Sequence, residues 1–549
     1  MKLTDAHIAN RVSTSPNFMD LRRKMHRMRR LVAGDISALD DDGSTQSEDK
    51  MSGTYKPDAG DLYDILNRDF DEGRANVLLQ SVRTLHLQVS LTHPDIEFED
   101  LDTDMAGIHS LWFKSRMAPC VPQVKVKRCT ANYLIDALGV AFCGMRSGSP
   151  VIDHVDPMDM TWDLTAETFD ELNWAARQIR LPLWQWQEKF KNNEKLNELA
   201  IGNDNLDMPV TMIVYHDRTG LDTGNEAYFL SQGLNGTVSE DDLIERTKNL
   251  YSEYVGGVER TCVPYVFMNY MELPSVKVPI SPVEMMLSAQ IAMWAADRNI
   301  RDTIDMGAGM REYEEGAYDA DELTRWMDGD RASLLKRKKT AVGMNQIEPM
   351  EVAQTVLAYR QQQEQNIIAQ SGVDPYLSGN KVDNIEFAAQ VNAIKGSAGL
   401  VAGSVAKDVS VFWQKIVKRT ICNGHKFDEE PITLLMRDGA DMLEYVFNKD
   451  NPIRDYLKPG SDIVISEDTL TFKPRDQKAQ EALLDVQLGQ ALAPLGYTNF
   501  LPKALENYLR AKGEKNPGEW LEMQAPPMDP MMGGPAMDPA GDAQASTAA

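Results

Sequence analysis

The spacing of apolar residues divides the chain into a mixed first half and a helical second half. Between Asp61 and Val89, leucine, isoleucine and valine recur three and four residues apart, as on a helix face that packs into a core. A buried helix or strand continues from Tyr133 to Phe142. Strand-like runs follow at three places: 151–155, 210–215 and 263–270. Four large apolar residues predict an amphipathic helix between about 171 and 199: Trp174, Ile179, Trp184 and Trp186. The first half is therefore predicted to be α+β.

The second half begins with a well-delimited helix. Ser281 can cap it, Pro282 suits its first turn, and Glu284 has the spacing of a capping box. An apolar stripe follows: Met286, Leu287, Ile291, Trp294, Ile300 and Ile304. Because Gly307 and Gly309 come directly after this stripe, we expect the helix to end near residue 306.

Two more long helices are predicted after a polar insertion over 310–346. Pro349 opens the second helix and Gly372 ends it, and a loop rich in proline and glycine leads to a third helix over 384–422. Small residues crowd the third helix. Each glycine inside a helix costs about 1 kcal/mol relative to alanine. The four glycines from Gly396 to Gly424 therefore indicate a close helix approach or a kink.

The remainder of the chain mixes strand, helix and a tail. A two-strand unit is predicted from 432–436 and 462–465, followed by a strand at 469–472. A helical region is predicted from Gln477 to about Lys512. From Gln524 onward, repeated Met-Asp-Pro and Gly-Gly-Pro units contain too few core-forming residues to fold. We expect this tail to be disordered.

Bulk composition narrows the class of protein. The 549 residues, 42% of them hydrophobic and 26% charged, suit two or three globular domains. A formal charge of −26 argues against tight wrapping of nucleic acid, because phosphate-neutralising surfaces are rich in lysine and arginine. The five cysteines include no CxxC pair, which favours a reducing cytoplasm over a disulfide framework or zinc site. Apolar stretches are too short to span a bilayer and no signal-peptide core is present, so neither secretion nor membrane insertion is expected.

Signatures of catalysis are sparse. The sequence has no GxxxxGK[ST] phosphate loop, no HExxH and no GxSxG, so we expect neither an enzyme nor a bound cofactor. The densest set of candidate ligands is His154, Asp156, Asp159 and Asp163. A metal or acid–base site would use such residues, but a strand that ends in an Asx-Pro turn accounts for them without any bound ion or catalytic role. We favour the structural interpretation.

Three basic segments stand out in this acidic chain. The segment 21–31 predicts an amphipathic helix whose charges either face solvent, which we favour, or contact DNA or a partner. Within 325–340, six Lys and Arg residues and two Asp residues leave a net charge of +4, consistent with a contact surface or a solvated turn. On the third helix, Lys395 and Lys407 suit a DNA path or a solvated face equally well, whereas Lys415 and Lys418 are expected to face solvent.

The order of these elements resembles a known family. Three local sequences carry the resemblance: Val155-Asp156-Pro157 to Trp162-Asp163, followed by a Trp-containing helix; Val263-Pro264-Tyr265 to Pro279-Ile280-Ser281-Pro282, leading to Gln290; and Gly372-Val373-Asp374-Pro375 with Glu386 downstream. In this order they resemble a wing element, the entry into the stem and the approach to the tunnel loop of portal proteins of tailed double-stranded DNA bacteriophages. The resemblance covers roughly residues 60–510.

The resemblance implies a division of the chain into portal parts. These are an N-terminal region and wing (1–280), a first stem helix (281–306), a clip (307–348), a second stem helix (349–371), a tunnel loop (372–384), a tunnel helix and wing return (385–474), a helical crown (475–523) and a disordered tail (524–549). The clip is short, and its strands and partner surface are not identified from the sequence.

The resemblance also implies function and partners. The chain would form a ring, dodecameric in the family, at one capsid vertex of the virion, after assembly in the host cytoplasm. Double-stranded DNA would pass through the channel during packaging and ejection. The terminase large subunit, head-completion or tail adaptor proteins, and the major capsid and scaffold proteins would bind the ring. Residues expected to line the channel are Asp374, Tyr376, Asn380, Lys381, Lys395 and Lys407, and those expected to bind partners at the clip are Arg325, Arg331, Lys336, Arg337, Lys338 and Lys339.

Two other classes of protein compete with this interpretation. A nuclease or packaging ATPase is disfavoured by the missing phosphate loop and by the lack of a carboxylate cluster in a pocket-like context. Among other phage head proteins, a scaffold would be more uniformly helical, and a capsid subunit would contain more strand and no insertion bracketed by helices.

Overall fold

The computed structural model describes about two thirds of the chain, and the structural statements below concern only those residues. They are 4–13, 16–34, 76–90, 96–98, 101, 103–146, 148–191, 193–201, 207–218, 224–231, 238–255, 257–273, 276–309, 311–312, 345–346, 353–371, 388–438, 441–465, 475–492 and 500–512. The predicted tail after Gln524 lies outside them, as do the first turns of the helix expected from Asp61. The chain divides into two compact units, Met1–Phe472 and Lys473–Ala549. Helices and strands are mixed, which confirms the α+β prediction.

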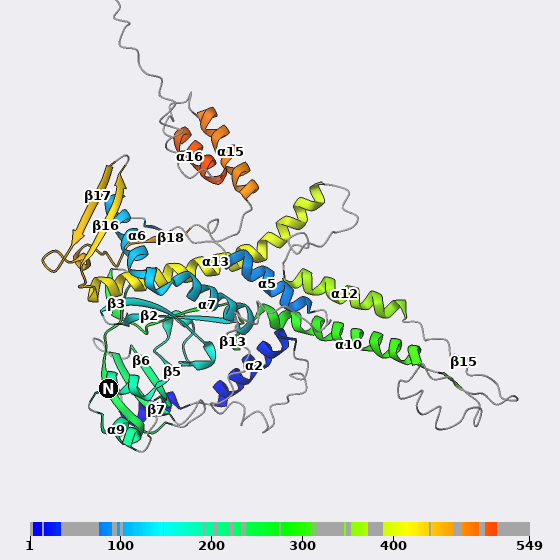
Figure 1. Cartoon of the computed structure of the whole chain (residues 1–549), viewed down its shortest axis with the longest axis horizontal. Coiled ribbons are helices and arrows are strands. Elements are labelled where there is room, and N and C mark those ends of the chain that lie inside the picture. The colour runs from blue at the N-terminus through cyan, green and yellow to red at the C-terminus, as the bar shows by residue number, and fades with distance from the viewer. Residues whose placement is uncertain are drawn as a thin grey trace, which may run out of the picture. The chain divides into compact units, whose positions relative to one another are not determined.

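A five-stranded antiparallel sheet forms one part of the first unit (Figure 1). Its strands, in spatial order, are β4 (Met160–Trp162), β5 (Trp174–Pro182), β6 (Pro209–Asp217), β7 (Gly224–Ser231) and β8 (Leu243–Asn249). Side chains alternate between the two faces of a strand, and here both faces are covered. Ile213 and Tyr215 pack in a cluster with α1 (Asp5–Val12), whereas Met212 and Val214 pack with residues of α8 (Leu183–Lys189) and α9 (Glu194–Ile201).

This sheet corrects the prediction of a helix over 171–199. Trp174 and Ile179 belong to β5, and the helical structure begins only at Leu183. Ala175 and Ala176, which point to opposite faces, are both fully buried. Because both faces of β5 are covered, its sequence lacks the alternation of apolar and polar residues that marks a half-exposed strand.

A three-stranded sheet lies next to a tight helix-to-strand connection. Its order is β11 (Tyr265–Asn269), β2 (Leu138–Arg146) and β3 (Ser149–Val155), and α7 (Pro122–Asp136) leads directly into β2. Ala137 ends α7 in the left-handed conformation, with φ of 67°. A Cβ on Gly139 would lie 2.5 Å from the carbonyl oxygen of Cys129, so glycine permits the strand to start this close to the helix. The buried run from Tyr133 to Phe142 is therefore half helix and half strand.

The largest core surrounds the long helix α13 (Ala388–Phe427), which packs on the three-stranded sheet (Figure 1). Its predicted end at Cys422 is five residues too early. Helices α2 (Pro16–Val32), α5 (Val77–Ser90) and α6 (Thr103–Met117) contribute to this core, together with α7 and parts of the two long helices described below. Gly424 confirms the predicted close approach, because Trp112 of α6 lies against it, whereas Gly403 has open space around its Cα. The surroundings of Gly396 and Gly399 lie outside the description.

Small antiparallel pairs complete the first unit. They are β1 (Ile96–Phe98) with β18 (Ile463–Ile465), β9 (Ser252–Val255) with β10 (Val258–Thr261), β12 (Met271–Leu273) with β13 (Val276–Ile280), β14 (Arg311–Glu312) with β15 (Asn345–Gln346), and β16 (Ile432–Asp438) with β17 (Asp441–Phe447). The predicted two-strand unit from 432–436 and 462–465 is wrong in its pairing. The first strand forms a hairpin with β17, which was not predicted, and the second pairs with β1. The strand predicted at 469–472 lies outside the described residues.

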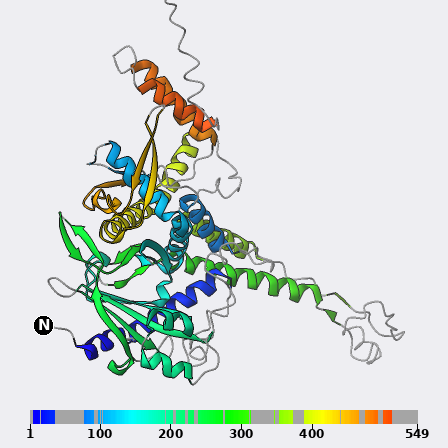
Figure 2. The same cartoon turned by 60° about the vertical axis from the view of Figure 1, so that its left-hand side comes forward.

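Two long helices flank the segment 310–353. Helix α10 (Pro282–Gly309) begins where predicted, with the Ser281 hydroxyl accepting a hydrogen bond from the Glu284 amide at 3.0 Å. It extends three residues beyond the expected end at 306. Helix α12 (Gln354–Ser371) lies alongside it (Figure 2). The predicted start of this helix at Pro349 lies outside the described residues.

The second unit contains two packed helices, α15 (Arg475–Leu492) and α16 (Phe500–Lys512), within the predicted helical region. Val486 and Ala482 of α15 and Ala504 of α16 are buried. Short 3-10 turns occur in the first unit: η2 (Ala118–Cys120), η3 (Pro157–Asp159), η4 (Phe169–Glu171), η5 (Glu240–Asp242) and η6 (Ile453–Asp455). Within the described parts of both units, none of the helices combines the length and apolar character needed to cross a membrane.

Candidate functional site

The helical pair α10 and α12 is the first candidate functional region. The N-terminal half of α10 and the C-terminal turn of α12 belong to the main core, through Val283, Met286, Met293 and Ile367. The two helices are therefore antiparallel, and their far ends carry the segment between them. Arg360 of α12 joins them by an ion pair from Nε to Asp297 Oδ1 of α10, and its Nη1 lies 3.3 Å from Glu364. The hydrogen bond to Asp297, together with the attraction of its charge, raises the pKa of Arg360, so its guanidinium stays charged.

Large apolar side chains of α12 are exposed in the single chain. Among its described residues only Ile367 and Ser371 are buried, and Leu357 and Tyr359 retain 47% and 48% of their surface. Met285 of α10 is 43% exposed. Scattered exposed apolar residues are common on proteins, but a helix that is exposed over most of its length gains little stability from its own chain. Leu357 and Tyr359 are two residues apart and point to different sides of α12, and both sides are open to contact with another protein surface.

Most of the predicted channel and clip residues fall outside the described chain. This applies to four channel residues, Asp374, Tyr376, Asn380 and Lys381, and to all six clip residues, Arg325, Arg331, Lys336, Arg337, Lys338 and Lys339. Lys395 lies in α13, in a part whose side chains are not described. The two short strands β14 and β15 mark where the chain leaves α10 and returns toward α12.

The described lysines of α13 differ in their surroundings. Lys407 is exposed, next to Asp408, which accepts a hydrogen bond from the hydroxyl of Tyr133 at 2.5 Å. Lys415 and Lys418 are partly exposed, as expected, and each forms an ion pair, Lys415 with Asp170 at 2.7 Å and Lys418 with Asp462 at 3.0 Å. Lys407 attracts the neighbouring Asp408 and so opposes the rise in the pKa of that carboxyl caused by burial, and Lys407 stays a candidate channel cation.

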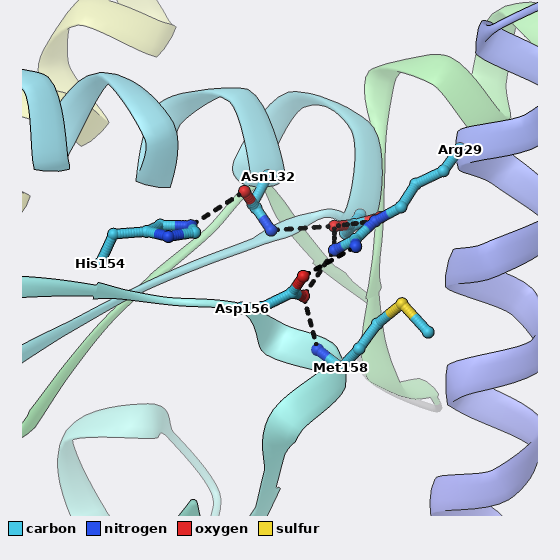
Figure 3. A network of polar contacts seen from close by, with 6 residues as sticks. Arg29, Asn132, His154, Asp156 and Met158 are labelled. Atoms are coloured by element: carbon cyan, nitrogen blue, oxygen red, sulfur yellow. Dashed lines mark hydrogen bonds and ion pairs between the residues drawn. The ribbon is translucent and has the colours of Figure 1, made fainter. Parts of the chain in front are cut away.

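The favoured interpretation of 21–31 as a solvated face is correct for Arg27, which is exposed, but wrong for Arg22 and Arg29. Arg22 of α2 is 3% exposed, and Arg29 is bonded to Asp136 and Asp156 (Figure 3). Leu21 and Met25 are buried on the same helix. Helix α2 docks on α7 and η3 of the same chain, and contact of this helix with DNA or a partner stays a prediction.

Arg29 is the centre of a polar cluster between α2, α7 and the turn after β3. Nε and Nη2 of Arg29 donate to Asp136 at 3.1 and 2.5 Å, and Nη1 and Nη2 donate to Asp156 at 2.9 and 2.7 Å. Asn132 donates to Asp136 at 3.2 Å, and its amide oxygen lies 3.2 Å from Nε2 of His154 (Figure 3). Asp156 also accepts from the amide of Met158 and so caps η3. Four segments of the chain thus meet at one guanidinium.

Burial and charge set the protonation of this cluster. Burial raises the pKa of Asp136 to about 6, although Arg29 opposes the shift. For Asp156, burial alone would raise the pKa, but Arg29 and the hydrogen bonds at its carboxylate lower it overall. The Asp136 side chain is fully buried, whereas that of Asp156 retains 34% of its surface. Asp136 is therefore the carboxylate of the pair that more readily takes a proton.

The structure favours the Asx-Pro turn at the predicted cluster of His154, Asp156, Asp159 and Asp163. Strand β3 ends at Val155, Asp156 caps the turn, and Asp163 accepts hydrogen bonds from Thr165 and Asn173. In the described part of the chain, no group of three or more His, Cys, Asp or Glu side chains has the arrangement of a metal site.

Arg29 and Asp136 were not identified from the sequence as interacting residues. A signal was present, because Arg22, Met25 and Arg29 recur at helical spacing on the face that carries the apolar residues of α2. Arginines on an apolar helix face predict buried carboxylate partners. The sequence could not reveal which carboxylates, since Asp136 is more than a hundred residues away.

Neither a protein-family model nor a curated protein sequence matches this chain. We therefore infer its function from its own residues and their arrangement.

Proposed function

We propose that this chain is the ring-forming subunit of a tailed-bacteriophage portal, the conduit for DNA packaging and ejection at one capsid vertex of the virion. The observation that carries the proposal is the antiparallel pair α10 and α12, which brackets a separate segment and is followed by a helix of 40 residues. The α+β body before this pair and the helical unit after it supply the remaining parts of the order that the sequence resemblance implies.

In this proposal the parts have distinct roles. The two sheets and the helices around them form the wing, α10 and α12 form the stem, and 307–348 forms the clip. The segment 372–384 is the tunnel loop, α13 is the tunnel helix, and the crown comprises 475–523, which includes α15 and α16. The clip binds the terminase large subunit during packaging and head-completion or tail adaptor proteins afterwards. Capsid and scaffold proteins surround the ring.

The exposure of α12 supports assembly into a ring. Leu357 and Tyr359 lose contact with water only if another surface covers the helix. In a ring, each subunit contacts its neighbour through two different surfaces, so the stem helices of one copy can cover those of the next. Burial of such side chains stabilises the assembly by about 25 cal/mol per Å² of apolar surface.

The charge of the chain supports passage of DNA over retention. With a net charge of −26, the protein repels a polyanion at long range, and binding must rely on local cations. Lys395 and Lys407 on α13, together with Asp374, Tyr376, Asn380 and Lys381, are the proposed channel residues. Arg325, Arg331, Lys336, Arg337, Lys338 and Lys339 are the proposed partner-binding residues of the clip.

Electron microscopy of the purified full-length protein tests the proposal. Negative-stain images are expected to contain rings with a central hole, and native mass spectrometry of the same sample is expected to give one dominant oligomer, twelve copies in the family. A protein that stays monomeric or dimeric at concentrations up to about 10 mg/ml, with no ring in the images, would overturn the portal proposal. So would magnesium-dependent nuclease activity or ATP hydrolysis that co-purifies with the chain.

A further inference from the structure

We propose that Arg29, Asp136 and Asp156 form a proton-responsive clasp, which holds α2 more tightly against the body of the protein after the carboxylate pair has taken up one proton. This inference concerns the single chain and does not depend on ring assembly. It rests on the geometry of the cluster in Figure 3.

Two carboxylates share one guanidinium in this cluster. Asp136 Oδ2 and Asp156 Oδ1 both bond Nη2 of Arg29, at 2.5 and 2.7 Å, so the two acidic groups lie within a few ångströms of each other. The Asp136 side chain has no exposed surface. Two carboxylates on a single cation leave one negative charge uncompensated, and this costs free energy because Asp136 is shielded from water. Addition of one proton removes that cost, as it does in other carboxylate pairs.

The surrounding charged groups do not remove the excess negative charge. Arg22, also on α2, lies close enough to attract Asp156 and Asp159 of η3. Two guanidinium groups thus face three carboxylates. His154 on β3 is linked to Asp136 by the two hydrogen bonds of Asn132. On the side of α10, Lys24 forms an ion pair with Glu284, and these two charges neutralise each other. Arg22 and Arg29 thus balance two of the three carboxylates of Asp136, Asp156 and Asp159, and a protonated His154 would attract Asp156 as well.

The proton resides on Asp136. Asp156 keeps contact with water and accepts the Met158 amide, which favours its ionised form, and its lowered pKa keeps it ionised throughout the range from pH 5 to 7.5. The pKa of Asp136, raised to about 6 by burial, lies within that range. A carboxylate whose pKa is raised by docking makes docking stronger at low pH, and this contribution is lost as the pH rises through the raised value.

The clasp affects more than its own surroundings, because α2 joins separate parts of the fold. Phe18, Leu21 and Met25 pack in the core beside the five-stranded sheet, whereas Met28 and Val32 pack in the core around α13. The same helix contacts α10, through the ion pair of Lys24 with Glu284 and through Leu31 against Trp294. Tighter docking of α2 therefore steadies the first turns of α10, where that helix leaves the body.

Hydrogen–deuterium exchange of the full-length protein tests the clasp. The readout is the protection of peptides from 16–34 at pH 5.0 and pH 7.5, after correction for the intrinsic pH dependence of exchange. A pKa of about 6 in the docked state, against about 4 for a free aspartate, makes docking about tenfold stronger at pH 5.0 than at pH 7.5. Equal protection at the two pH values in the wild-type protein would refute the proposal.

Three variants assign the effect to Asp136. Asp136→Asn mimics the protonated side chain and is expected to give high protection at both pH values. Asp153→Asn, on neighbouring β3 and paired with the exposed Arg146, is the matched control and is expected to keep the tenfold difference. His154→Gln keeps a donor toward Asn132 and is also expected to keep it. A response that survives Asp136→Asn but disappears in His154→Gln would assign the proton to the histidine and overturn the proposal.

A fourth variant covers the case in which Asp136→Asn does not fold. Asp156→Asn leaves one carboxylate on one guanidinium, so Asp136 should ionise more easily and the rise in protection should move to lower pH. An unchanged midpoint in Asp156→Asn would show that the two carboxylates do not share a proton.

Discussion

The indole of Trp112 lies directly against Gly424, so close that a Cβ on this glycine would be 2.2 Å from the ring. Trp112 comes from α6 and Gly424 from the last turns of α13, and both are in the main core. This contact explains the presence of a poor helix former at position 424.

Substitution of Gly424 is expected to destabilise the protein. Gly424→Ala gains about 1 kcal/mol of helix propensity, but forcing a methyl group into the ring of Trp112 costs about 1–3 kcal/mol. The expected result is a lower thermal unfolding midpoint by calorimetry. Gly403→Ala is the matched control, since Gly403 has no atom within 4 Å of the added Cβ, and it should raise the midpoint. A rise in both variants would contradict the packing argument.

The buried carboxylate of Asp428 is expected to be essential for stability. It accepts hydrogen bonds from the Trp112 indole at 2.8 Å and from Nε and Nη2 of Arg116 at 2.9 Å, and its side chain is fully buried. Asp428→Asn leaves the Arg116 guanidinium without its main counter-charge, which should cost about 3 kcal/mol. Glu429→Gln removes a largely exposed ion pair with Arg454 and should cost less than about 1 kcal/mol. Denaturant unfolding of the two variants measures the difference. Comparable decreases in the free energy of unfolding in both variants would contradict it.

Acid sensitivity is expected from His86. Burial lowers its pKa to about 4, and its Nε2 lies 3.0 Å from the carbonyl oxygen of Lys127. A histidine whose folded pKa is below its unfolded value does not reduce the free energy of unfolding above about pH 6.5. It reduces this free energy progressively as the pH falls toward 4. At pH 5 the loss is on the order of 2 kcal/mol.

Denaturant unfolding of His86→Gln at two pH values measures this effect. The variant should be less stable than, or equal to, the wild-type protein at pH 7.5, and should lose less stability on transfer to pH 5. Parallel losses in the two proteins would place the acid sensitivity elsewhere.

Ring assembly, if the proposed function holds, is expected to depend on the exposed face of α12. Leu357→Asp places a charge on the face proposed to contact the next subunit and should shift the protein from rings to single chains in analytical ultracentrifugation. Leu357→Met keeps an apolar side chain of similar size at the same position and should leave the rings intact. Rings that persist in Leu357→Asp would exclude this face from the interface.

Features that depend on neighbouring residues in the chain could be predicted. Ser281 caps α10 through a contact three residues away, and the apolar stripe that follows requires only helical spacing. Strands β6 and β11 were recognised because their apolar runs are short and uninterrupted. Helix ends were less accurate: α13 continues to Phe427, because its last turns are buried by partners such as Trp112 that the local pattern does not contain.

Features that depend on distant partners could not be predicted. The segment of β5 with its fully buried alanines could equally form a buried helix by its local sequence. It is a strand because it pairs with distant strands of a sheet that is covered on both faces. Strand β18 lies far from β16 because it pairs with β1. In the same way, Arg29 was interpreted as a solvated charge, since nothing within α2 reveals the two carboxylates that surround it.

By itself, the sequence determined the α+β class, the long helices at 282–309, 354–371 and 388–427 to within a few residues, and the order of segments that resembles a portal protein. Periodicity and capping depend on residues a few positions apart, so a short segment of the sequence contains all the information that they need. The tertiary structure alone decided which strands pair, that Gly424 accommodates Trp112, and that Asp136 and Asp156 share Arg29. These depend on contacts between residues tens to hundreds of positions apart, where burial sets the energy of a charge or a methyl group.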